Sequence, residues 1–136
     1  MQNIDPAATA LVLISAALVF VMTPGLAFFY GGLVRRKNVL SIMMQSFMSM
    51  GIVTVIWVFF GFSLAFGKDL GGVIGDLRHV ALIGVGSDPG IVAGVKQSIP
   101  FLAFFVFQEQ FAVITPALIT GAFADRVTFK SYLIFL

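Results

Sequence analysis

The sequence contains no cysteine and few charged residues. Without cysteine the chain has no disulfide framework and no thiol chemistry, and it gives no indication of a redox compartment. Charged residues make up 10% of the 136 residues, whereas a soluble domain carries about a quarter. The formal net charge of +2 is small, so the chain lacks the basic patch with which proteins bind nucleic acid.

The residue clusters of common catalytic and metal sites are also missing. His79 is the only histidine, and no group of Ser, Asp or metal ligands accompanies it at a useful spacing. A lone histidine in a loop is more often solvated than catalytic. Since phosphate-binding glycine loops and metal motifs are absent as well, we expect a protein that is not an enzyme, with no catalytic residue, metal or cofactor.

Long hydrophobic runs are what the sequence does contain. Hydrophobic residues make up 60% of the chain, and the runs 6–34, 38–67 and 97–124 each exceed the roughly 20 residues that a membrane helix needs. A fourth run begins at 131–136, where the chain stops, and we interpret this ending as a truncation. The opening MQNID lacks the basic segment of a signal peptide, so we expect the first run to be retained as a span.

These runs predict an all-α, polytopic membrane protein built as a helix bundle. Hydrocarbon offers no water to backbone N–H and C=O groups, and the composition shows no barrel-like alternation, so the spans must be helices. We expect helices at about 7–33, 39–66 and 98–123, the start of a fourth at 131–136, and an outer loop at 67–97.

Cations predict which helix ends face the cytoplasm. Residues 35–37 are all basic, and Arg126 and Lys130 follow the third run. By the positive-inside rule both segments face the cytoplasm, which places the N-terminus outside. The cations of the loop 67–97 are matched by acidic residues, in keeping with an outer position.

The third run carries phenylalanines at helical spacing. Phe104, Phe107 and Phe111 fall on one face of a helix. Aromatic faces attract cations, ammonium-type ligands among them, and stacked rings can also form a hydrophobic constriction. Ordinary packing of phenylalanine is the alternative that periodicity alone leaves open.

Glu109 is the only ionisable residue between Lys96 and Asp125. It lies about 200° around the helix from Phe107 and Phe111, and therefore on the opposite side. An acid inside a membrane is a functional hypothesis by default, because burying its charge costs roughly 2.5–3.5 kcal/mol or more unless it is protonated or paired.

Three segments carry a family resemblance. MTPGLAFFYGGLVRRKNVL at 22–40, SLAFG at 63–67 and FQEQFAVITPALITGAFADR at 107–126 together closely resemble the first part of ammonium transporters of the Amt/Mep/Rh class. The resemblance implies a homotrimer of eleven-helix protomers in the cell membrane. Each protomer would contain two inverted five-helix repeats and one pore, with the N-terminus outside, as the cations also predict.

The resemblance also assigns roles to two residues. In the family pattern F-Q-x-x-x-F-A, the two phenylalanines form a stacked gate beneath an outer ammonium site, and these carry over onto Phe107 and Phe111. Ammonium, or methylammonium as its analogue, would be recruited by cation–π contacts and lose its hydration and its proton before the nitrogen passes the gate, so that it is conducted as ammonia, with or without an accompanying proton. A P-II-type regulatory protein at the cytoplasmic face is the implied partner.

Several family motifs do not occur within residues 1–136. The two pore histidines, the Asp of a D-F-A-G motif, and the Trp and Ser of the outer site are all missing, and His79 belongs to the outer loop. The chain therefore resembles less than the first inverted repeat, and half a repeat cannot enclose a pore. We expect residues 1–136 alone not to conduct ammonium.

Glu109 and Gln110 depart from the small or neutral residues of the family pattern. Because Glu109 lies across the helix from the gate, we expect it to face a neighbouring helix or subunit, hydrogen-bonded or neutral. Proton or ammonium binding is the alternative role. A small four-helix proton-coupled cation or drug exporter using Glu109 is the alternative function, and a purely structural membrane subunit is a third.

Overall fold

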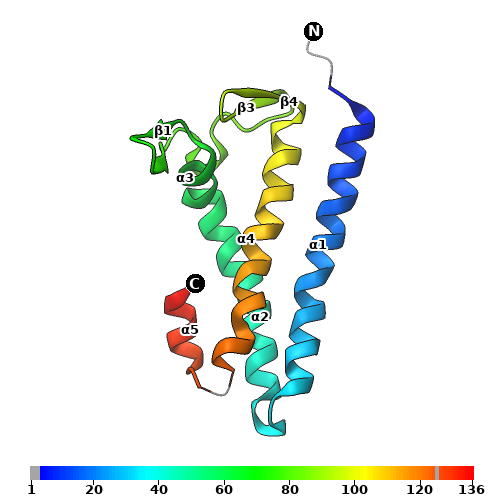
Figure 1. The fold of residues 1–136 in the computed structure, drawn as a ribbon, viewed down its shortest axis with the longest axis vertical. Coiled ribbons are helices and arrows are strands. Elements are labelled where there is room, and N and C mark those ends of the chain that lie inside the picture. The colour runs from blue at the N-terminus through cyan, green and yellow to red at the C-terminus, as the bar shows by residue number, and fades with distance from the viewer. Residues whose placement is uncertain (1–3, 125) are drawn as a thin grey trace. The chain divides into compact units, whose positions relative to one another are not determined.

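A computed structural model describes residues 4–124 and 126–136. Three long helical stretches carry most of the chain, and Figure 1 shows the elements in sequence order from blue to red. The helical elements are α1 (Pro6–Leu33), η1 (Arg36–Asn38), α2 (Val39–Ile56), η2 (Trp57–Gly61), α3 (Phe62–Phe66), η3 (Val80–Leu82), α4 (Phe101–Phe123) and α5 (Phe129–Phe135). The strands are β1 (Asp69–Leu70), β2 (Ile74–Gly75), β3 (Pro89–Val92) and β4 (Val95–Pro100).

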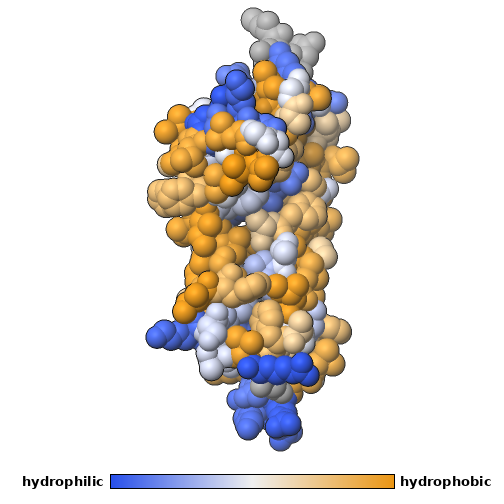
Figure 2. Space-filling view, turned by 60° about the vertical axis from the view of Figure 1, so that its left-hand side comes forward, coloured by the Kyte–Doolittle hydropathy of each residue, from blue (hydrophilic) through white to orange (hydrophobic). Residues whose placement is uncertain are grey.

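Three of these helical stretches are long and apolar enough to cross a membrane. They are Pro6–Leu33, Arg36–Phe66 and Phe101–Phe123, with mean hydropathies of 2.3, 2.0 and 1.6. Figure 2 shows the consequence on the face turned to the viewer, where hydrophobic atoms cover most of the surface. The prediction of a mostly helical, polytopic membrane fold is confirmed.

Local sequence explains where the first helix begins. The carboxylate of Asp5 accepts hydrogen bonds from the backbone N–H groups of Ala7, at 2.9 Å, and Ala8, at 3.1 Å. Such capping satisfies N–H groups that have no partner within the helix. Pro6 occupies the first helical position, where its missing N–H costs nothing.

Two small antiparallel hairpins, β1–β2 and β3–β4, occupy the segment that the sequence predicts only as a loop. Gly71 and Gly72 form the turn between β1 and β2 with φ of +70° and +79°, a conformation that costs glycine little. Strand β4 extends to Pro100, and α4 accordingly begins at Phe101 rather than near residue 98.

The chain divides into two compact units. One contains residues up to Ala16 together with Val55–Glu109, and the other contains Ala17–Thr54 together with Gln110–Leu136. We refer to them as unit 1 and unit 2.

Unit 1 has an aromatic core. Phe62 is completely buried, and its ring centroid lies 5.3 Å from that of Phe101 and 5.0 Å from that of Phe105. Such ring pairs favour edge-on and tilted arrangements, as here. The core therefore fixes the first turns of α4 against α3.

A single π-helical turn, η2, precedes α3 in unit 1. Within it the Trp57 ring lies against Gly61, where an added Cβ would be 2.7 Å from Cε3 of the indole. Glycine is thus the residue that permits this packing. Turns of this kind inside α-helices are frequent at functional sites.

Unit 2 is held by polar as well as apolar contacts. Its buried polar side chains are Thr23, Gln45, Ser46, Ser49, Gln110 and Thr120. Ser49 and Thr120 donate within their own helices, to the carbonyls of Ser46 at 2.7 Å and Pro116 at 3.1 Å. Tyr30 makes a contact between helices, because its hydroxyl donates to the carbonyl of Leu118 at 2.8 Å while its ring lies against Gly121.

Candidate functional site

Both predicted gate residues lie in α4. Phe107 is half-buried in unit 1, and Phe111 is 45% exposed in unit 2. The helix continues through both positions, so the argument from helical periodicity applies to them. Thr115 donates from its hydroxyl to the carbonyl of Phe111 at 2.6 Å, which ties the backbone at Phe111 to the next turn.

Phe104, one turn before Phe107, connects the phenylalanine face of α4 to the aromatic core of unit 1. Its ring centroid lies 5.0 Å from that of Phe66 and 6.2 Å from that of Phe101, with the Phe101 ring stacked on it. The side chain of Phe104 is therefore held on two sides. The backbone that carries Phe107 begins from this fixed turn.

Glu109 is half-buried in α4, at the end of unit 1. The next residue, Gln110, is 8% exposed and belongs to unit 2. The expectation that Glu109 faces a neighbouring helix or subunit stays a prediction.

His79 is half-buried in the outer loop and makes specific contacts there. Its ring packs 5.2 Å from Phe101 and 6.1 Å from Phe62, centroid to centroid. Nδ1 donates to the carbonyl of Ile83 at 3.0 Å, since a carbonyl can only accept. The side chain thus joins the outer loop to the aromatic core, a structural role that residue counting could not reveal.

Asp76 anchors the outer loop to the end of α3. Its carboxylate accepts from Nε of Arg78 at 2.7 Å and from the backbone N–H of Lys68 at 3.0 Å. Partial burial alone would raise the pKa of Asp76, but these donors favour the charged form and hold the pKa below its ordinary value. Its carbonyl also accepts from the hydroxyl of Ser63 at 2.8 Å.

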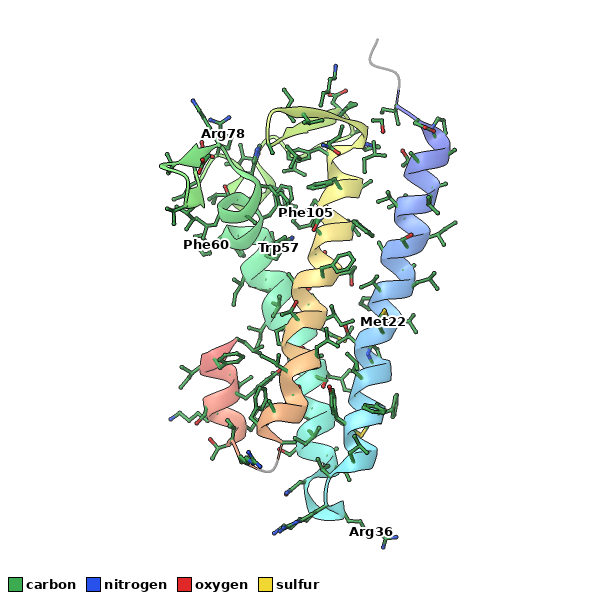
Figure 3. All side chains as sticks on the ribbon, viewed as in Figure 1. Met22, Arg36, Trp57, Phe60, Arg78 and Phe105 are labelled. Atoms are coloured by element: carbon green, nitrogen blue, oxygen red, sulfur yellow. The ribbon has the colours of Figure 1, made fainter. Side chains whose placement is uncertain are left out.

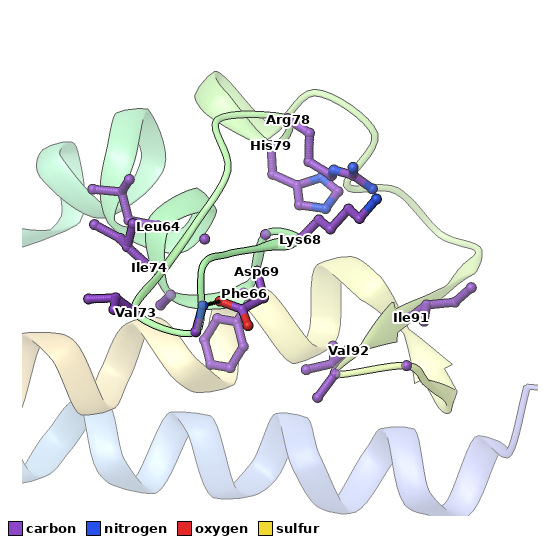
Figure 4. Close-up of a pocket in the computed structure, with 16 residues that line it drawn as sticks. Leu64, Phe66, Lys68, Asp69, Val73, Ile74, Arg78, His79, Ile91 and Val92 are labelled. Carbon is purple, nitrogen blue, oxygen red and sulfur yellow. Dashed lines mark hydrogen bonds between the residues drawn. The ribbon is translucent and has the colours of Figure 1, made fainter.

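A pocket of about 810 Å³ opens beside the end of α3, between the two hairpins (Figure 4). Lys68 and Arg78 contribute positive charge to its wall and Asp69 contributes negative charge, while Phe66 and Val92 are apolar. Arg78 is paired with Asp76, which does not line the pocket, so Lys68 and Asp69 remain as the oppositely charged groups of the wall. Neither predicted gate residue lines it.

No group of three or more potential metal ligands occurs among residues 4–124 and 126–136. Sequence reasoning missed Phe62 and Ser63, which the structure buries at the junction of α3 with the outer loop. Ser63 opens the SLAFG segment of the family resemblance and Phe62 directly precedes it. That resemblance was the only signal in the sequence, and it did not show which residues these two side chains contact.

Known proteins resemble this chain over most of its length. A family model described as Ammonium Transporter Family matches residues 10–136. An ammonium transporter of Bacillus subtilis (strain 168) is 49% identical over 127 residues, which cover 93% of this chain and 30% of the relative. An ammonium transporter of Mycobacterium bovis is 46% identical over 143 residues, with coverages of 96% and 30%.

A solved structure gives the same result in three dimensions. The crystal structure of Saccharomyces cerevisiae Mep2 matches with a TM-score of 0.82 and 31% sequence identity, over 98% of this chain and 30% of that one. The chain therefore spans 30% of the length of the curated relatives and of the solved structure described here.

Proposed function

This chain belongs to the Ammonium Transporter Family, and from that premise we propose that the whole protein conducts ammonium across a membrane. The chain supplies three of its membrane-length helices. The observation that carries the proposal is the family match over residues 10–136. The match includes the second and third membrane-length helices completely and the first one from residue 10 onward.

Phe107 and Phe111 are the proposed gate on the conduction path. Support comes from their four-residue spacing within α4 and from the F-Q-x-x-x-F-A pattern that contains them. The ring face of Phe107 attracts the cation at the outer mouth. The ring of Phe111 keeps the passage below it narrow and dry.

This arrangement separates recruitment from conduction. A cation held by aromatic faces and hydrogen bonds gives up part of its hydration shell. A dry, apolar constriction then disfavours the charged form, because burying an unpaired charge is costly. Ammonium therefore passes its proton to water of the outer mouth before the nitrogen passes Phe111, and ammonia crosses the constriction.

The proposal includes an orientation and partners. The basic residues 35–37, Arg126 and Lys130 face the cytoplasm of the cell membrane, so the N-terminus lies outside. The whole protein assembles as a homotrimer, and a P-II-type regulatory protein contacts the cytoplasmic face. These basic segments supply part of that surface.

The family is one of transporters rather than enzymes, and the comparisons do not favour the four-helix exporter as an alternative. In the proposed account Glu109 has no part in binding the transported cation. It faces a neighbouring helix or subunit on the side of α4 away from the gate.

A growth assay tests the proposed function. Cells without their own ammonium transporters are expected to grow on low ammonium when they express the whole protein, because it conducts the substrate. Cells that express only residues 1–136 are expected not to grow, because three spans cannot enclose the pore. Growth with residues 1–136 alone, or failure of the correctly inserted whole protein, contradicts the proposal.

A further inference from the structure

The hairpin β1–β2 places apolar side chains in an exposed position just beyond a membrane span. Leu70 is 57% exposed, Val73 at the tip is 89% exposed and Ile74 is 48% exposed. Leu70 and Ile74 are direct partners across the two strands, so they lie side by side. An aqueous loop tip normally carries small or polar residues instead.

Close backbone packing sets the position of this hairpin relative to the end of the span. Gly75 of β2 is buried against the last turns of the span, and an added Cβ there would lie 2.6 Å from the carbonyl oxygen of Ser63 and 2.7 Å from that of Leu64. Ser63 and Leu64 both belong to the membrane-length helix Arg36–Phe66. The strand therefore runs beside the end of the span and not above it.

The hydrogen bonds around Asp76 hold the hairpin in this place. The hydroxyl of Ser63 donates to the carbonyl of Asp76 at 2.8 Å, and the carboxylate of Asp76 accepts from the N–H of Lys68. The bond from Ser63 thus ties the end of β2 to the helix, and the bond from Lys68 ties the two ends of the hairpin to each other. In Figure 1 the hairpin accordingly extends sideways from the end of α3.

Apolar and charged side chains separate on this hairpin. Figure 4 shows Val73 and Ile74 on the same side as Leu64 of the span, with Lys68 and Arg78 pointing to the other side. Figure 2, which brings this side of unit 1 forward, shows hydrophobic atoms below the hydrophilic ones of the outer loop. The apolar tip is therefore continuous with the surface of the span.

We propose that the β1–β2 hairpin is a membrane-interface anchor, whose tip residues Leu70, Val73 and Ile74 insert at the boundary between lipid headgroups and acyl chains. Apolar side chains beside a polar, charged segment are the pattern of elements that lie in this interface. Lys68 and Arg78 extend towards the headgroups and water, as long cationic side chains do at such boundaries. The proposal depends on the membrane fold and not on which substrate is transported.

Spin labelling of the whole protein tests the anchor directly. Residues 1–136 contain no cysteine, so a nitroxide on Val73→Cys reports a single position once any cysteine beyond them is replaced. Phe60→Cys, on an exposed face of the span, is the lipid reference, and Ser87→Cys, exposed in the outer loop, is the aqueous reference. All three are examined in vesicles of phosphatidylethanolamine and phosphatidylglycerol.

The readout is the accessibility of the nitroxide to oxygen, which concentrates in lipid, and to nickel–EDDA, which stays in water. The anchor predicts that the oxygen-to-nickel ratio at position 73 shifts from the value at 87 towards the value at 60. A ratio equal to that at 87 contradicts the proposal, since the tip is then in water. Low accessibility to both reagents also contradicts it, since another protein segment or subunit then covers the tip.

Discussion

Replacing Phe111 by alanine is expected to lower saturable methylammonium uptake about tenfold to thirtyfold, a fold-change that corresponds to about 1.4–2 kcal/mol. The shortened side chain leaves the constriction wide enough for water, so the dry passage that disfavours the charged form is lost and deprotonation is no longer favoured. Radiolabelled methylammonium uptake by cells with equal amounts of wild-type and variant protein measures the effect.

Glu109→Gln is the matched control for this prediction. It changes a residue of the same helix, two positions away and on the opposite side, and replaces the carboxyl group by an amide of nearly the same size. Uptake is expected to stay near the wild-type value. A fall as steep as that of Phe111→Ala would contradict the proposed gate geometry and assign the cation to Glu109.

Replacing Phe62 by alanine is expected to cost about 3–5 kcal/mol in the free energy of unfolding, as for other fully buried aromatic residues. The Phe62 side chain is completely buried and its ring neighbours come from α3, α4 and the outer loop. Its loss therefore leaves a cavity where these elements meet. Denaturant titration of the whole protein in detergent micelles measures the change.

Phe60→Ala is the control for the cavity, because it removes the same side chain from the same helical stretch. Phe60 is 53% exposed and, in Figure 3, points away from α4, whereas Trp57 lies on the side towards it. We expect a cost of about 1 kcal/mol or less, as for other exposed positions. Equal costs for the two variants would contradict the central position of Phe62.

Hydropathy was sufficient to predict the membrane fold, because the energetic demand of hydrocarbon acts on whole segments of about 20 residues. A prediction from hydropathy does not require knowing which residues are in contact. Helical periodicity likewise placed Phe107 and Phe111 on one face of α4, and their role as a gate stays a prediction. Both inferences use properties of a single segment, its hydropathy and its helical periodicity, and the three membrane-length helices have both.

The outer segment could not be predicted in the same way. Strands of two residues such as β1 and β2 are too short to show alternation, and their pairing depends on the turn at Gly71 and Gly72. The position of His79 depends on rings that approach from α3 and α4. Sixteen phenylalanines in the chain likewise gave no means of telling that Phe62 is the buried centre.

Direct flux through the purified whole protein in liposomes tests the central claim, that this chain is part of an ammonium conductor. An inward ammonium gradient is expected to produce a saturable flux that empty liposomes lack, and the Phe111→Ala protein in the same liposomes is expected to show much less. Flux no greater than in empty liposomes, from wild-type protein that is folded and correctly inserted, would contradict the account.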